Sequence, residues 1–147
     1  MIRSAGIIPF RENSEGTLEF FVGHPGGMAR PYWAYMKGQV EEGEDVPHAA
    51  MREFAEESGL DVSWVSRENL IPLGTTLQNR NKVVTAYGLW WPDIDPKECF
   101  SNLVDNSTIP EIDRYAWMTL DALRGMTHSA HIRFYEDLTR MWEARSE

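Results

Sequence analysis

The segment that most constrains this chain is residues 38–60, which read GQVEEGEDVPHAAMREFAEESGL. Glu53, Glu56 and Glu57 stand at positions i, i+3 and i+4, so on a helix their carboxylates leave one face within a single turn. Like charges at this spacing destabilise a helix unless a positive charge lies between them. Hard oxygen ligands that converge in this way suit Mg²⁺ or Mn²⁺. The alternative is a solvated acidic face, which is common in a chain with 23 acidic residues.

The same segment carries the signals of a helix over about residues 46–58. Asp45 suits the N-cap position, and Pro47 falls in the first turn, where its missing N–H costs nothing. Gly59 falls where the end of a helix favours a left-handed residue. The apolar stripe opposite the glutamates consists of Val46, Ala50 and Phe54.

The spacing favours a metal site over a solvated face, because the segment matches the pattern G-x5-E-x7-R-E-U-x-E-E-x-G-U, in which U is apolar. Seven fixed positions match by chance with a probability of order ~10⁻⁶ in a chain of this length. The segment therefore resembles the box of the Nudix hydrolase family. The fixed positions are Gly38, Glu44, Arg52, Glu53, Glu56, Glu57 and Gly59, and the apolar ones are Phe54 and Leu60.

This resemblance implies an enzyme that acts on a phosphoric anhydride, cleaving the diphosphate linkage between a nucleoside and a variable group with Mg²⁺ or Mn²⁺ and an attacking water. Carried onto the matching positions, the family's roles make Glu56 and Glu57 the leading metal ligands. Glu53 becomes a further ligand or the general base, and which glutamate is the base stays open. Gly38 resembles the loop glycine whose carbonyl binds the metal. Arg52 is expected to pair with a glutamate and orient it.

Further site residues are expected outside the box. Glu111, in EIDRYAWM, resembles a family glutamate that precedes a Trp-containing strand, so it is a candidate metal ligand or base. An exposed loop carboxylate is the alternative, and Glu98 and Asp105 are its rivals in the same loop. Lys37 and Arg30 are candidate contacts for substrate phosphates, and a simple surface cation is the alternative for each.

Other conspicuous residues are expected to be structural. Glu44 belongs to the box but is expected to be a structural acid or an acid in the outer shell of the metal. Of the four histidines only His24, in an HPGG loop, draws interest. Cys99 is the single cysteine, so it forms no internal disulfide and is expected to be a half-buried apolar residue. The aromatic residues expected mainly in the core, with base stacking as the alternative, are Trp33, Tyr35, Trp90 and Trp91.

Composition narrows the class of protein. A chain of 147 residues with 42% hydrophobic residues predicts one globular domain over residues 1–147. The net charge of −9, with no basic run, argues against nucleic acid or an anionic membrane as a partner. No segment has the length of a transmembrane span, and the first residues lack a signal peptide's apolar region. We therefore expect a cytoplasmic protein with a small-molecule nucleotide substrate.

Hydrophobic periodicity predicts an alternation of strands and helices. Mixed strands with a central and a terminal helix predict an α/β fold, with residues 92–110 as a long loop. The family resemblance implies the Nudix fold, an α/β/α sandwich with a mixed sheet. The predicted strands cover residues 4–10, 18–22, 32–36, 70–77, 83–91 and 115–118, and the predicted helices cover 46–58, 120–123 and 129–145.

The wider layout resembles short bacterial Nudix proteins that are expected to be nucleoside triphosphate pyrophosphohydrolases. Met36 departs from the layout of these proteins, because many relatives carry proline at that position. ADP-ribose hydrolases often carry a proline at a position past the box where this chain has Thr75. Dinucleoside polyphosphate hydrolases often carry a tyrosine where this chain has residues 76–78. A nucleoside triphosphate is therefore the leading substrate, and a dinucleoside polyphosphate of the Ap4A type is the runner-up.

Two other classes of function are weaker. A nucleotide-sensing Nudix module without catalysis usually loses box glutamates or carries a DNA-binding domain, whereas this chain keeps every box residue. An isoprenoid diphosphate isomerase needs a cysteine-bearing motif that is not visible around Cys99. Many relatives are dimers, so a homodimer is a further expectation of the resemblance.

Overall fold

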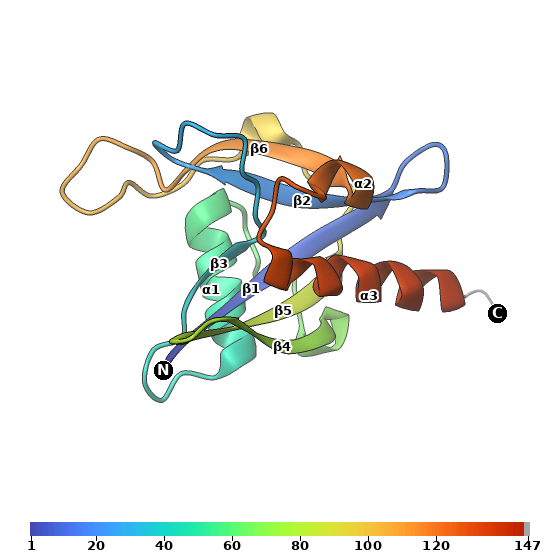
Figure 1. The fold of residues 1–147 in the computed structure, drawn as a ribbon, viewed down its shortest axis with the longest axis horizontal. Coiled ribbons are helices and arrows are strands. Elements are labelled where there is room, and N and C mark those ends of the chain that lie inside the picture. The colour runs from blue at the N-terminus through green and yellow to red at the C-terminus, as the bar shows by residue number, and fades with distance from the viewer. Residues whose placement is uncertain (146–147) are drawn as a thin grey trace.

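The computed structural model, which describes residues 1–145, has a six-stranded sheet with helices on both faces (Figure 1). No helix among these residues is long and apolar enough to cross a membrane. The strands are β1 (Ile2–Glu12), β2 (Leu18–Pro25), β3 (Met36–Gln39), β4 (Ile71–Asn79), β5 (Lys82–Trp90) and β6 (Ile112–Thr119). The helices are α1 (Val46–Ser58), α2 (Leu120–Leu123) and α3 (Ile132–Ala144), with short 3₁₀ turns at Arg67–Asn69, Pro96–Glu98 and Ser129–His131.

The sheet is mixed, as expected, and β1 is its central strand. The strand order is β4-β5-β1-β2-β6, with β5 parallel to β1 and the other pairs antiparallel. On the edge of β1 opposite β5, β3 pairs with residues 4–7 and β2 pairs with residues 10–12. Two strands thus share one edge of β1, and the chain between them, residues 26–35, loops out of the sheet beside β2.

Two hydrophobic cores hold the helices against opposite faces of the sheet. Phe134 and Leu138 of α3 belong to one core, and Phe54 of α1 belongs to the other. All three side chains are fully buried. The α/β/α sandwich implied by the family resemblance is therefore confirmed.

The box helix begins and ends where its local signals predict. The α1 helix runs from Val46 to Ser58, and Gly59 ends it with φ of 73° and an N–H that donates to Ala55 O. Asp45 occupies the N-cap position, but its side chain makes no capping hydrogen bond. It forms an ion pair with Arg67 instead, which ties the start of α1 to the chain that follows the helix.

One predicted strand is wrong. The aromatic segment 32–36 is mostly loop, and β3 begins only at Met36. The N–H of Trp33 donates to Met126 O at 2.7 Å, so it is used by a distant turn and not by a sheet ladder. Tyr35 is buried, 2% exposed, because the α3 core receives its ring. Aromatic composition here reflects core packing and not a strand.

The other differences are matters of boundaries. β6 begins at Ile112, earlier than predicted, because its first residues pair with the end of β2. β2 itself extends through His24 to Pro25, into the expected HPGG loop. The predicted terminal helix 129–145 starts with a 3₁₀ turn before α3.

Trp33 and Trp91 pack partly buried against the cores as expected, whereas Trp90 is 40% exposed and stacks on Trp142.

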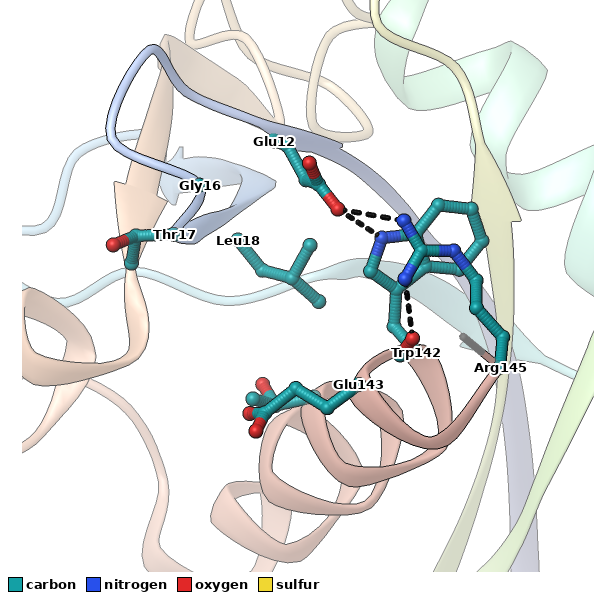
Figure 2. Close-up of a pocket in the computed structure, with 8 residues that line it drawn as sticks. Glu12, Gly16, Thr17, Leu18, Trp142, Glu143 and Arg145 are labelled. Atoms are coloured by element: carbon teal, nitrogen blue, oxygen red, sulfur yellow. Dashed lines mark hydrogen bonds and ion pairs between the residues drawn. The ribbon is translucent and has the colours of Figure 1, made fainter. Parts of the chain in front are cut away.

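A cavity of about 380 Å³ lies where the end of α3 meets the β1–β2 hairpin, and none of its lining residues belongs to the box (Figure 2). The Trp142 indole N–H donates to Glu12 Oε1 at 2.5 Å, and Arg145 donates to the same oxygen at 2.9 Å. The Arg145 guanidinium also lies 3.8 Å from the Trp142 ring centroid. These contacts join the helix end to the hairpin, so this feature is structural.

His131 is a fully buried titratable group at the start of α3. Its Nε2 is 2.8 Å from Gln78 Oε1, and its Nδ1 has no hydrogen-bond partner among the described residues. Burial is the main cause that lowers the pKa of His131 to about 3, and the positive charges of Lys37, His128 and Lys82 add to the effect. The ring is therefore neutral at pH 7.

We expect this histidine to make the fold acid-sensitive. The unfolded chain takes up the proton near pH 6.5 and the folded chain only near pH 3, so stability is complete above 6.5 and falls as the pH drops between these values. In urea unfolding at pH 7 and pH 4, His131→Phe should lose less stability than the natural chain, by a few kcal/mol. His48→Ala, which changes an exposed histidine, is the control. An unchanged pH dependence in His131→Phe would contradict this account.

Candidate active site

The α1 helix presents its three glutamates at different depths. Phe54, on the opposite face, is fully buried and fixes the rotation of the helix on the sheet. Glu57 is only 9% exposed, the Glu53 side chain is 13% exposed, and the Glu56 side chain is 42% exposed. One helical face therefore carries a buried, a nearly buried and a solvent-facing carboxylate.

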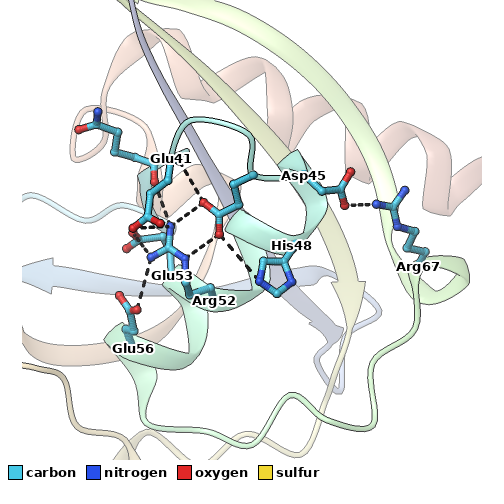
Figure 3. A network of polar contacts seen from close by, with 9 residues as sticks. Glu41, Asp45, His48, Arg52, Glu53, Glu56 and Arg67 are labelled. Carbon is cyan, nitrogen blue, oxygen red and sulfur yellow. Dashed lines mark hydrogen bonds and ion pairs between the residues drawn. The ribbon is translucent and has the colours of Figure 1, made fainter.

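Arg52 forms a fork that connects α1 to the loop before it (Figure 3). Its Nε and Nη2 donate to the two oxygens of Glu44 at 2.8 and 2.9 Å, and its Nη1 donates to Glu53 at 2.9 Å and to Glu56 at 3.4 Å. Nη2 also donates to the Gln39 carbonyl at 3.1 Å. The guanidinium thus lies among three glutamates, as expected for the residue that offsets their repulsion.

Glu44 has the surroundings of a structural acid. Both of its oxygens accept hydrogen bonds from Arg52, and one also accepts the N–H of Glu41 at 3.0 Å. The Arg52 hydrogen bonds are the main cause that lowers the pKa of Glu44 to about 2. Glu44 is therefore ionised at neutral pH, with both oxygens already engaged.

Glu57 lies among like charges. Burial is the main cause that raises the pKa of Glu57 to about 8, followed by the carboxylates of Glu53 and Glu111, and Lys37 opposes the shift. The pKa of Glu53 is also raised, first by burial, with Arg52 opposing and Glu111 contributing. The structure therefore brings Glu111, from the distant loop before β6, into electrostatic contact with two of the box glutamates.

A cavity of about 400 Å³ opens beside these groups, and we call it the glutamate cavity. Its charged lining residues are Lys37, Glu57 and Glu111, and neither Glu98 nor Asp105 lines it. Burial is the main cause that lowers the pKa of Lys37 to about 8. The other residues that line the cavity are Gly23, Pro25, Gly26, Tyr32, Ala34, Tyr35, Val104 and Ile112.

Gly38 lies against the Glu53 carboxylate. A Cβ atom at Gly38 would lie 2.0 Å from that carboxylate, so only glycine leaves room for it in this position. Gly38 is held in β3 opposite Ala5 of β1. Gly38, which lies in β3 and not in the expected loop, is therefore adjacent to the helix glutamate with which the sequence predicts it to share a site.

The chemistry of these donors fits a divalent cation. Carboxylate oxygens and a backbone carbonyl are the ligands that Mg²⁺ and Mn²⁺ prefer. Burial is the main cause that raises the pKa values of Glu53 and Glu57, and neighbouring carboxylates add to both shifts. Within residues 1–145, no three acidic, histidine or cysteine side chains converge at one point. The arrangement is a set of acids around Gly38 and the glutamate cavity, with Glu56 at its exposed rim.

Three residues outside this cavity adjoin or contact residues that line it, and the sequence singles out only His24 among them. His24 is fully buried in β2, with its Nδ1 2.7 Å from Asp113 Oδ1 and its Nε2 2.9 Å from the Arg30 carbonyl. Asp113 follows Glu111 by two residues, and this spacing, which puts both on one side of an extended segment, is the only sequence signal for it. Tyr115 donates its hydroxyl to the Glu57 carbonyl at 2.5 Å.

Cys99 is half-buried, as expected. Burial is the main cause that raises the pKa of its thiol to about 11, and the carboxylates of Asp95 and Glu98 add to the effect. A thiol with a raised pKa is a poor nucleophile at neutral pH.

Comparison with known families matches residues 2–138 to the NUDIX domain. The chain belongs to the Nudix family. It is therefore a hydrolase that acts on diphosphate linkages. No curated protein sequence is similar enough to match this Nudix chain.

Solved structures share its fold at low sequence identity. A C. elegans Ap4A hydrolase in a binary complex is 20% identical with a TM-score of 0.68, covering 98% of this chain and 99% of that one. The MutT protein from Methanosarcina mazei Go1 is 18% identical with a TM-score of 0.66, covering 95% and 94%. The NUDIX domain of Shewanella oneidensis NrtR, complexed with ADP ribose, is 13% identical with a TM-score of 0.65, covering 100% and 89%.

Gly38→Ala tests the contact between β3 and the Glu53 carboxylate. The new methyl group would displace the Glu53 carboxylate, which is the movable end of a side chain, so we expect the melting temperature to change little. Mg²⁺-dependent turnover should fall roughly tenfold to a hundredfold, because displaced ligands or their supports typically cost that much. Gln39→Ala, at the next and exposed residue, is the control. Full activity in Gly38→Ala would show that this contact does not matter.

Arg52→Lys tests the fork. Lysine keeps the charge but cannot make the two-pronged contact with Glu44 while also holding Glu53. We expect Mg²⁺-dependent turnover to fall roughly tenfold or more. Arg67→Lys, which alters an ion pair outside the glutamate cluster, should have no such effect. Equal turnover in the two variants would mean that charge alone suffices at position 52.

Proposed function

We propose that this Nudix protein is a Mg²⁺- or Mn²⁺-dependent pyrophosphohydrolase of nucleoside triphosphates and related diphosphate derivatives, with water attacking phosphorus. The observation that carries this proposal is that Glu57 and Glu111 line one cavity together with Lys37, with Glu53 close enough to contribute to the raised pKa of Glu57. The cavity therefore offers carboxylates that can bind a metal ion and a lysine that can bind a phosphate. We further propose that the protein acts in the cytoplasm, in keeping with its single, unpaired cysteine.

The proposed metal ligands are the carboxylates of Glu53, Glu56, Glu57 and Glu111 together with the backbone carbonyl of Gly38. When bound, a divalent cation neutralises diphosphate charge and lowers the pKa of a coordinated water. Arg52 holds Glu53 through a 2.9 Å hydrogen bond and so keeps its carboxylate oriented toward Gly38. Either Glu53 or Glu56 is the proposed general base.

Lys37 is the proposed contact for a substrate phosphate within the glutamate cavity. It belongs to β3, one residue before Gly38, and it lines the same space as Glu57 and Glu111. A rigid strand therefore fixes the spacing between the proposed phosphate contact and the proposed metal site. Tyr32, Tyr35 and Ile112 contribute apolar surface to the lining of the same cavity.

Catalysis is preferred to a purely sensing role because every box residue is present and engaged. Arg52, Glu53 and Gly38 make specific contacts with one another or with their neighbours. The NUDIX domain of NrtR shows that a protein of this fold binds ADP ribose. A ligand-binding role without turnover is therefore the alternative, and measurement of turnover on a panel of substrates distinguishes the two.

Glu57→Gln is the decisive variant. Glutamine keeps the size of the side chain but removes its charge, so Mg²⁺-dependent turnover should be lost while the fold is retained. Phosphate release should be measured with Mg²⁺ and with Mn²⁺ on nucleoside triphosphates, nucleotide sugars, ADP-ribose and dinucleoside polyphosphates. Glu98→Gln, an exposed acid outside the glutamate cavity, is the control. Unchanged turnover in Glu57→Gln would sink the site assignment, and a natural chain that cleaves nothing would favour a binding module.

A further inference from the structure

A second cavity of about 400 Å³ lies next to the glutamate cavity, and we call it the arginine cavity. It is formed where the loop after β2 meets the turn after α2, two segments joined by the hydrogen bond from Trp33 N to Met126 O at 2.7 Å. Tyr32 lines both cavities, so the two adjoin at this residue. The residues that line the arginine cavity are Arg30, Pro31, Tyr32, Gly125, Thr127 and His128.

The two cavities have opposite charge character. Two of the three charged residues that line the glutamate cavity are acids, whereas the described residues that line the arginine cavity include no carboxylate. Arg30 is exposed, and no carboxylate in residues 1–145 forms an ion pair with it. Its guanidinium lies 5.2 Å from the Tyr32 ring centroid. In a chain of net charge −9, the arginine cavity therefore carries a positive charge with no ion-pair partner among the described residues.

The backbone that carries Arg30 is tied to the same strand that follows Glu111. The buried His24 ring bridges the Arg30 carbonyl, at 2.9 Å, and the Asp113 carboxylate, at 2.7 Å. The N–H of Gly26 donates to the Glu111 carbonyl at 2.8 Å. A Cβ atom at Gly26 would lie 1.6 Å from the Pro110 carbonyl oxygen, so the loop after β2 packs directly against the backbone of the segment before β6. These contacts fix the position of the Arg30 backbone relative to that of Glu111.

We propose that the arginine cavity binds the part of a polyphosphate chain that extends beyond the linkage being cut. This inference rests on the proposed function and names its substrate class, which is nucleotides with three or more phosphates in the chain. A diphosphate linkage occupies the glutamate cavity, and further phosphates pass Tyr32 and meet the guanidinium of Arg30. Arginine suits this role because its planar fork binds phosphate oxygens in pairs.

The test compares substrates that share a diphosphate but differ in the group attached beyond it. The kcat and KM of the natural chain and of Arg30→Gln should be measured in Mg²⁺ with ADP-ribose, ATP and diadenosine tetraphosphate. Loss of one charged hydrogen-bonding group should raise the KM of the two polyphosphates about tenfold or more, with kcat and the KM of ADP-ribose little changed. The matched control is Arg124→Gln, at an exposed arginine beside the same turn that pairs with Glu136 and does not line either cavity.

The outcomes separate this inference from the proposed function. An equal rise in KM for all three substrates would place Arg30 at the shared diphosphate and overturn the subsite, as would no rise for any of them. If the natural chain cleaves none of them, the proposed function fails, and calorimetry with inorganic tripolyphosphate and pyrophosphate then decides the subsite alone. Weaker binding of tripolyphosphate, but not of pyrophosphate, to Arg30→Gln supports it, and equal binding by both chains overturns it.

Discussion

The repulsion between carboxylates held against the sheet is the constraint on which the rest of this site depends. Glu57 is nearly buried, and Glu53 and Glu111 add negative charge around it. Such a group is costly unless cations surround it. Arg52 on one side and Lys37 on the other supply fixed positive charge, and the remaining excess makes the place suitable for a divalent cation.

The pairing of two strands with one edge of β1 determines how the glutamates are reached from solvent. Because β2 and β3 pair with different halves of the same edge of β1, the chain between them must leave the sheet and return. That excursion forms one wall of the glutamate cavity and carries Tyr32 and Arg30. The fold thus places an acidic and a basic cavity side by side, in keeping with the proposed binding of a polyphosphate together with a divalent cation.

Local signals predicted the box helix well and the segment before it badly. The ends of α1 follow from Pro47, from Gly59 and from the apolar stripe, all of which act within a few residues of the chain. The segment 32–36 was predicted as a strand because it is aromatic, yet Trp33 and Tyr35 serve the core and a contact with Met126. Their conformation depends on residues far away in the sequence, since Trp33 and Met126 are 93 positions apart, and no local pattern records such a contact.

By itself, the sequence determined the helix over residues 46–58, the single face shared by Glu53, Glu56 and Glu57, the α/β class and the Nudix family, because spacing and helical geometry are local. Only the tertiary structure decided that Glu57 is buried while Glu56 faces solvent, and that Glu111 joins the box glutamates. It also placed Arg30 in a separate cavity, through the bridge that His24 makes to Asp113. The burial of a side chain and its distance to other charges depend on segments that are far apart in the sequence, so both are set only when the sheet has assembled.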